Sequence, residues 1–299
     1  MTQVSERLRS ASGVIGGLAV LLLIVALAGS GGVSAQESVG GDDEPTLFER
    51  GDAAYRTRDW GDALRWFVQA ANQGDAAAQN MIGEMYGRGE GVGQDDAEAL
   101  RWFTMAAEQK DHEAETNLGI AYREGYGVTR NYDQAQAWLE RAAKYNYPAA
   151  IYHLGIMYEH EMLIAEDEEV WIDMYERAAK LGYGPAQARL GHMYETGVGF
   201  DRDLDDAIYW YNQATVRGET TAIISLAQLY IDGEGVPQDL VQAHALLTVA
   251  SFLGNRAAAP MILDLSKSLS KEQFDQSQLI ASGILAKVYA PKDEDDDLR

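Results

Sequence analysis

A 36-residue repeat constrains the fold of this chain more than any other feature. When the sequence is written in rows of 36, alanine, leucine, glycine and tyrosine fall into the same columns in successive rows. The tyrosine column contains Tyr86, Tyr122, Tyr158, Tyr194 and Tyr230, and an alanine column contains Ala78, Ala114, Ala150, Ala186, Ala222 and Ala258. Such a period indicates an array in which each unit buries its apolar face against its neighbours.

Each row reads as two helices. In the first, from about Ala76 to Gly87, the column residues recur at offsets of 3, 4 and 7, which place them on one helical face. A glycine-rich loop follows at residues 89–92 and supplies the backbone freedom of a tight turn. Asp95 then predicts the N-cap of a second helix, whose apolar face carries Trp102. The loop lacks the lysine and the preceding strand that a phosphate-binding loop requires.

These columns resemble the Sel1-like repeat, a subfamily of the tetratricopeptide-like helical hairpins. The resemblance rests on Ala-x-x-x-Leu-Gly-x-Met-Tyr, then Gly-x-Gly-Val, Asp, Ala, Trp and Ala-Ala, as in residues 78–107, and it covers about residues 46–290. It implies an all-α fold, a right-handed α/α superhelical solenoid of hairpins. The first unit departs from the pattern, because Gly51 and Ala63 lie 12 residues apart where Gly83 and Ala99 lie 16 apart. That shorter spacing is typical of an ordinary tetratricopeptide hairpin.

The fourth unit is irregular. Its loop at residues 161–165 has no glycine, and Trp171 stands in a column that other repeats fill with alanine. One interpretation is compensated packing of the core. The other is a docking patch in which Met162, Leu163 and Ile164 face solvent.

The amino terminus predicts a secretory signal peptide. Residues 14–28 are apolar or glycine, which is short of the roughly 20 residues that a membrane span needs. The small residues Val33 and Ala35 predict cleavage after Ala35. We therefore expect a periplasmic or secreted protein with no stable membrane insertion after cleavage. An uncleaved membrane anchor is the alternative.

The expected organisation follows from these boundaries. After the last repeat we expect two capping helices, about 256–269 and 271–289, with Ser270 as the N-cap of the second. The segments are a signal peptide (1–35), an acidic flexible lead-in (36–45), a tetratricopeptide-like first hairpin (46–75), five Sel1-like repeats (76–255), C-terminal capping helices (256–290) and an acidic disordered tail (291–299).

Composition and motifs argue against several kinds of chemistry. The chain has no cysteine, which excludes cysteine nucleophiles and cysteine-based metal sites, and its net charge of −23 disfavours nucleic acid. Its five histidines form no compact metal-ligand pair. Residues 268–271 match the S-x-x-K of penicillin-binding enzymes, but the partner motifs are missing. We therefore expect no catalytic residue, no metal and no cofactor.

The resemblance implies that the first helix of each hairpin lines a concave groove. Two positions per helix would face this groove. The residues at these positions in the middle of the groove are apolar: Ile120, Tyr152, Ile156 and Ile224. They either fill space between neighbouring helices or form a site for an extended peptide or helix. The candidate protein-binding residues, with flanking arginines, are Asn80, Glu84, Thr116, Ile120, Arg123, Tyr152, Ile156, Arg189, His192, Ile224 and Gln228.

The sequence thus predicts a non-enzymatic protein–protein interaction scaffold of the bacterial cell envelope that binds a protein or peptide. Two alternatives stay open. One is a periplasmic regulator that restrains a membrane sensor or an envelope machine. The other is an enzyme, or an enzyme accessory, that acts on cell-wall glycan.

Overall fold

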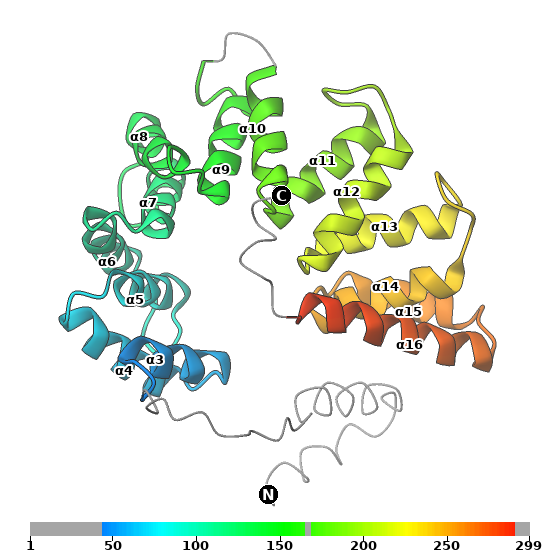
Figure 1. Ribbon diagram of the computed structural model, residues 1–299, viewed down its shortest axis with the longest axis horizontal. Helices are drawn as coiled ribbons and strands as arrows, with labels where there is room; N and C mark the ends of the chain where they lie inside the picture. Colours follow the sequence, from blue (N-terminus) through cyan, green and yellow to red (C-terminus); the bar gives the residue numbers. More distant parts are fainter. Residues whose placement is uncertain (1–43, 165–168, 291–299) are drawn as a thin grey trace, which may run out of the picture. The chain divides into compact units, whose positions relative to one another are not determined.

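The computed structural model describes residues 44–164 and 169–290, and within them the chain forms fourteen α-helices and no strand (Figure 1). This confirms an all-α repeat solenoid. The predicted signal peptide and most of the acidic lead-in lie outside the described residues, as does the acidic tail. Among the helices that the structure describes, none has both the length and the apolar character that a membrane span requires.

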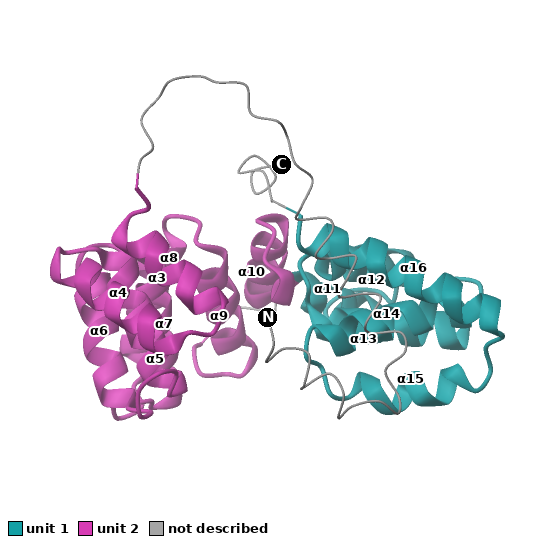
Figure 2. Cartoon of the chain, turned by 90° about the horizontal axis from the view of Figure 1, so that it is seen from below, with its two compact units in different colours: residues 1–38, 187–298 teal, residues 39–186, 299 magenta. Residues whose placement is uncertain are grey.

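The described residues divide into two compact units, 44–186 and 187–290, which we call the N-terminal and the C-terminal unit (Figure 2). The helices of the N-terminal unit are α3 (Leu47–Arg56), α4 (Trp60–Asn72), α5 (Ala76–Arg88), α6 (Asp96–Glu108), α7 (His112–Glu124), α8 (Tyr132–Ala143), α9 (Pro148–Glu159) and α10 (Glu169–Lys180). The division falls within α11 (Gly184–Thr196). The C-terminal unit continues with α12 (Leu204–Val216), α13 (Thr220–Asp232), α14 (Leu240–Phe252), α15 (Ala258–Ser266) and α16 (Lys271–Val288).

A glycine in the first helix of most hairpins lies against a large side chain of the second helix. A Cβ atom added at Gly191 would lie 2.5 Å from Cδ1 of Tyr211, closer than atoms can approach without movement. Five hairpins share this interlock, at Gly51 and Phe67, Gly83 and Phe103, Gly119 and Leu139, Gly155 and Tyr175, and Gly191 and Tyr211. The glycine column of the sequence therefore marks where two helices touch.

Helix caps fix the ends of the hairpins. Asp95 accepts backbone N–H groups at its predicted N-cap, and Asn131, Asp203 and Asp239 do the same at the equivalent positions of later repeats. In the loop after α7, Gly127 has a φ of +66°, and a side chain there would collide with the backbone carbonyl of Asp96. This loop thus packs on the start of α6 in the preceding hairpin.

Polar side chains link neighbouring hairpins. Arg141 on α8 donates to the carbonyl of Ala107 at 3.3 Å, and Arg177 on α10 donates to the carbonyl of Ala143 at 3.1 Å. Both carbonyls lie at the C-terminal end of the preceding second helix, where backbone acceptors have no partner within the helix. The same contact, one repeat apart, aligns successive second helices.

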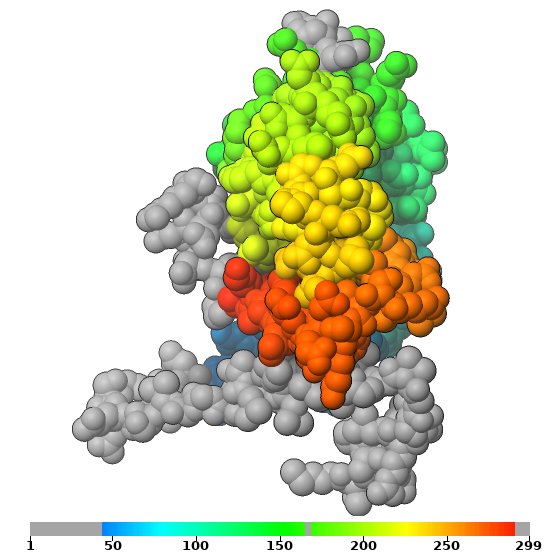
Figure 3. Space-filling model, turned by 90° about the vertical axis from the view of Figure 1, so that its right-hand side faces the viewer, coloured from blue at the N-terminus to red at the C-terminus, as the bar shows by residue number. Residues whose placement is uncertain are grey.

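The C-terminal helices pack as a cap on the last repeat. Helix α16 contacts α14 and α12, and Ser270 caps it through a capping box with Gln273. Figure 3 shows the orange and red surface of α15 and α16 next to the yellow surface of that repeat. The buried His244 of α14 lies 3.0 Å from Ser266 of α15 and 2.9 Å from Ser277 of α16, so one imidazole links all three helices.

In the irregular fourth repeat the structure favours compensated core packing, and it exposes only one of the three residues of the predicted docking patch. Trp171 is buried, with its ring 5.9 Å from that of Tyr175, so it belongs to the core. In the loop, Met162 and Leu163 are half-buried, whereas Ile164 is fully exposed.

The glycine interlock generates a stability prediction. We expect Gly191→Ala to lower the free energy of unfolding by about 1–3 kcal/mol, because the methyl group overpacks against Tyr211. Gly283→Ala on α16 is the matched control, since nothing lies within 4 Å of its added Cβ. The control should gain up to about 1 kcal/mol from helix propensity. Urea unfolding followed by circular dichroism measures both, and equal stabilities would contradict the interlock.

Candidate functional site

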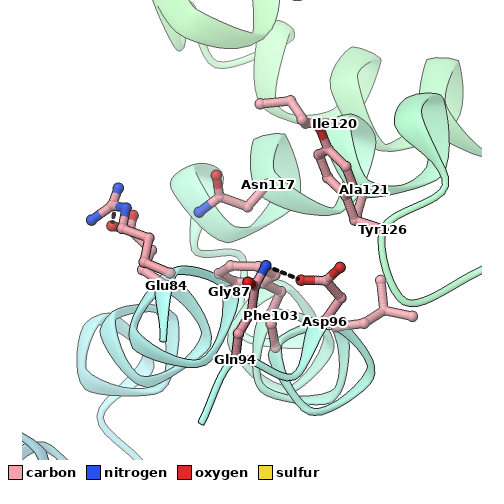
Figure 4. Close-up of a pocket in the computed structure, with 12 residues that line it drawn as sticks. Glu84, Gly87, Gln94, Asp96, Phe103, Asn117, Ile120, Ala121 and Tyr126 are labelled. Carbon is pink, nitrogen blue, oxygen red and sulfur yellow. Dashed lines mark hydrogen bonds and ion pairs between the residues drawn. The ribbon is translucent and has the colours of Figure 1, made fainter. Parts of the chain in front are cut away.

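A pocket of about 420 Å³ opens in the N-terminal unit between α5, α6 and α7 (Figure 4). Phe103, Ile120 and Tyr126 provide its large apolar surfaces. Its polar lining comes from Glu84, Arg88, Gln94, Asp96 and Asn117. The structure thus brings together Glu84 and Ile120, which the sequence placed at equivalent positions of two successive first helices.

The ion pairs at one side of the pocket hold Arg88 in place. Its guanidinium lies 2.8 Å from Oε2 of Glu84 and donates to the hydroxyl of Tyr55, also at 2.8 Å. The Tyr55 hydroxyl in turn donates to Glu90 at 2.7 Å. Arg88 is the single basic residue among those that line the pocket, and these contacts already engage its charge.

A second carboxyl group crowds Glu84. Glu113, in the first turn of α7, shares a hydrogen bond with Glu84. Partial burial, followed by the charges of Glu84 and Asp111, raises the pKa of Glu113 to about 7. By surface area the residue remains exposed, so water screens part of the repulsion. Two hairpins therefore bring two carboxyl groups together, and the pKa of Glu113 is raised there.

Two of the predicted groove residues, Asn80 and Thr116, are buried and do not face solvent. Asn80 accepts a hydrogen bond from Asn117 at 3.0 Å, which joins α5 to α7. Thr116 donates to the carbonyl of His112 at 2.8 Å, within α7. Each side chain is nearly inaccessible, so neither offers a partner much surface.

Arg123 was expected to flank the groove, but the structure places it inside the N-terminal unit. It is 8% exposed, donates to Glu124 at 2.7 Å and lies 3.2 Å from Nδ1 of His153. Burial, and then the charge of Arg123, lower the pKa of His153 to about 3. The neutral imidazole can therefore accept from the guanidinium, and this contact ties α7 to α9.

The two predicted residues on α9 are half-buried. Tyr152 packs among aromatic rings, 5.3 Å from both Tyr175 and Tyr183, and Ile156 follows one turn later. Tyr152 therefore contributes to packing as well as to surface.

The remaining candidates lie on α11 and α13 of the C-terminal unit. Arg189 and Ile224 are half-buried, whereas His192 and Gln228 are exposed. Gln228 donates to Asp232 at 2.7 Å on its own helix. The structure does not draw these four residues into the pocket.

Sequence reasoning missed Tyr126 and Glu113. Tyr126 is 54% exposed at the pocket, on the loop after α7. The signal was present, because Tyr126 stands in a column of Glu90, Met162, Val198 and Glu234, and Glu113 in one of Ala77, Ala149, Pro185 and Thr221. At both positions the residue type differs from that of the other repeats, and this difference is the signal that could have identified them.

The metal-ligand and S-x-x-K motifs considered from the sequence do not form a site in the described residues. Within residues 44–164 and 169–290, no group of three or more histidine, aspartate or glutamate side chains is arranged to hold a metal ion. The serine of the S-x-x-K match, Ser268, lies in the turn between α15 and α16 and is exposed.

The pattern of hairpins agrees with a known family. The Sel1 repeat model matches residues 41–75, 76–111, 112–144, 148–183, 184–215 and 220–255. The chain therefore belongs to the Sel1-repeat family, and the first hairpin, despite its shorter loop, is one of the six matched repeats. Sel1-repeat proteins generally mediate protein–protein interactions, and their scaffold is typically non-catalytic.

Solved structures show the same fold. A Sel1 repeat protein from Oxalobacter formigenes is 27% identical, with a TM-score of 0.62 over 79% of this chain and 99% of that one. Two immunity proteins from Pseudomonas aeruginosa each have a TM-score of 0.50. One is 20% identical over 84% of this chain and 91% of that one, and the other is 18% identical over 86% and 90%. At these identities the immunity proteins show the fold alone. A search among curated proteins gives no match.

The carboxyl pair generates a pH prediction. The folded-state pKa of Glu113 lies above its ordinary value of 4.5, so this group stabilises the fold at low pH and loses that contribution as the pH rises through about 7. Glu113→Gln removes the ionisation. We expect its melting temperature, relative to wild type, to be higher at pH 8 than at pH 5. Thermal melts at both pH values check this, with the exposed Glu140→Gln on α8 as control. An equal difference at both pH values would contradict the pairing.

Proposed function

We propose that this protein is a non-enzymatic scaffold of the bacterial cell envelope that binds a partner protein or peptide through the first helices of its hairpins. The observation that carries the proposal is the pocket of the N-terminal unit, where apolar and charged side chains from two hairpins meet. Membership of a family that generally mediates protein–protein interactions supports it.

The character of the pocket also supports a protein partner. Binding energy at protein interfaces concentrates in a few aromatic, arginine or aliphatic anchors. Tyr126 and Ile120 are anchors of this kind, and Tyr126 keeps more than half of its surface free in the absence of a partner. Aromatic side chains bring large contact areas at a small cost in conformational entropy.

The envelope location rests on the sequence of residues 14–35, which fits a secretory signal peptide. The bacterial origin of the similar Sel1 repeat protein from Oxalobacter formigenes is compatible with it. Periplasmic residence after cleavage at Ala35 is part of the proposal.

The proposal predicts that pocket variants lose the partner without losing the fold. Changing Ile120→Gln and Tyr126→Ser together should weaken binding by about 2 kcal/mol or more, roughly 30-fold. The variant avoids Tyr152, because its aromatic contacts would couple binding to stability. Affinity purification from an envelope extract identifies the partner, and titration with the purified partner gives the dissociation constant.

Tyr209→Ser is the matched control. Tyr209 is 53% exposed, nearly equal to Tyr126, but lies on α12 of the C-terminal unit. Its partner affinity should equal that of wild type. Full retention of binding by the pocket variant, with an unchanged melting temperature, would move the binding site off the first-helix surface.

A further inference from the structure

We propose that the pocket between α5, α6 and α7 receives a single arginine side chain of the partner. This rests on the proposed function, and it assigns the chemistry that the site recognises. The guanidinium would lie among the carboxylates of Glu84 and Asp96, and its aliphatic stem would contact Phe103, Ile120 and Tyr126.

The charge of the site is unbalanced in favour of a cation. Glu84 and Asp96 line the pocket as its two carboxylates. The one lining cation, Arg88, is shared between Glu84 and the Tyr55 hydroxyl, and lies 4.0 Å from Glu90. A second guanidinium would offset the excess negative charge in a partly desolvated site, where charge-assisted hydrogen bonds are strongest.

The arrangement of acceptors suits a planar, multidentate donor. In Figure 4, Gln94 donates through Nε2 to Oδ1 of Asp96 at 3.4 Å, which orients its amide oxygen as an acceptor. Asn117 donates one N–H of its amide to Asn80, and its amide oxygen is left as an acceptor. A guanidinium has five N–H donors in a fixed plane and matches such a set of oxygens better than an ammonium does.

The apolar lining fits the rest of the side chain. Arginine packs its methylene stem on apolar surface and stacks its guanidinium on aromatic faces. Phe103 and Tyr126 supply aromatic surface in the pocket, which has about 420 Å³ of space. That volume lies near the lower end of ligand pockets, about 300–1,000 Å³, and suits one long side chain with its flanking peptide at the rim.

The combination occurs in one repeat only. The equivalents of Tyr126 in the other repeats are Glu90, Met162, Val198 and Glu234, and the equivalents of Glu113 include Ala77 and Ala149. A feature required by the repeat itself would recur in every row. The residues that differ from the repeat pattern, Tyr126 and Glu113, therefore lie at or beside the pocket.

The test uses short peptides that differ in one end group, a charged guanidinium or a neutral urea of the same shape. N-acetyl-Gly-Arg-Gly-amide is titrated into the 15N-labelled protein, and the neutral citrulline peptide of the same shape is the matched ligand control. We expect saturable amide shifts at residues around Ile120 and Tyr126 with the arginine peptide and none with the citrulline peptide. Asp96→Asn and Glu84→Gln should each weaken the arginine peptide about tenfold, whereas Glu140→Gln on α8 should not.

Three outcomes would overturn the assignment. Unsaturating shifts spread over the acidic surface would show general attraction to a chain of net charge −23. Equal binding of the citrulline peptide would show that the pocket does not distinguish a charged side chain from a neutral one. Equal binding of the corresponding lysine peptide would show a cation site without preference for guanidinium. Thermal melts of each variant separate loss of binding from loss of fold.

The experiment is independent of the proposed scaffold function. A partner that depends on Ile120 and Tyr126 while the arginine peptide fails to bind would overturn this inference alone. An arginine peptide that binds at the pocket, combined with a partner that ignores the pocket variant, would establish a guanidinium site but overturn both the proposed mode of partner binding and the partner as the source of the arginine.

Discussion

The contact between a helix glycine and a large side chain of its partner helix underlies the rest of the structure. Without a Cβ atom at Gly83, the ring of Phe103 lies directly on the backbone of α5, and the same holds at Gly191 and Tyr211. This close approach sets the spacing of the two helices in five of the six hairpins. Because buried side chains are packed close to crystal density, the next hairpin must supply matching small residues, and the alanine column does so.

The repeat separates residues that build the array from residues that are available for recognition. Column residues such as Ala78, Leu118 and Tyr211 are buried and have no surface to offer a ligand. Variation is tolerated where side chains leave the core, at the start of first helices and in the loops. Glu113 and Tyr126 are of this kind, and they lie at or beside the pocket. A solenoid thus places specific chemistry in one repeat while the hairpin packing stays unchanged.

Most of the fold could be predicted from the sequence, because periodicity reports burial directly. The hairpins and the N-caps at Asp95 and Ser270 follow from residue type and spacing. The candidate site could be predicted only in part. Position within a helix selected Glu84 and Ile120, which the structure places at the pocket. It could not show that Asn80 and Arg123 bond to side chains of the adjacent hairpin and so leave the surface. Such contacts depend on how neighbouring hairpins pack, and the sequence of one repeat does not reveal this packing.

The carboxyl pair of Glu84 and Glu113 links stability to recognition. Partial burial first, and then the nearby charge of Glu84, raise the pKa of Glu113. A cation bound there replaces the proton, so ligand binding and proton release are reciprocal by thermodynamic linkage. Each group then reports on the other: conditions that ionise Glu113 weaken the fold slightly and strengthen the attraction for a cationic partner. The unbalanced charge costs the free protein some stability, and a guanidinium in the pocket restores the balance in the complex.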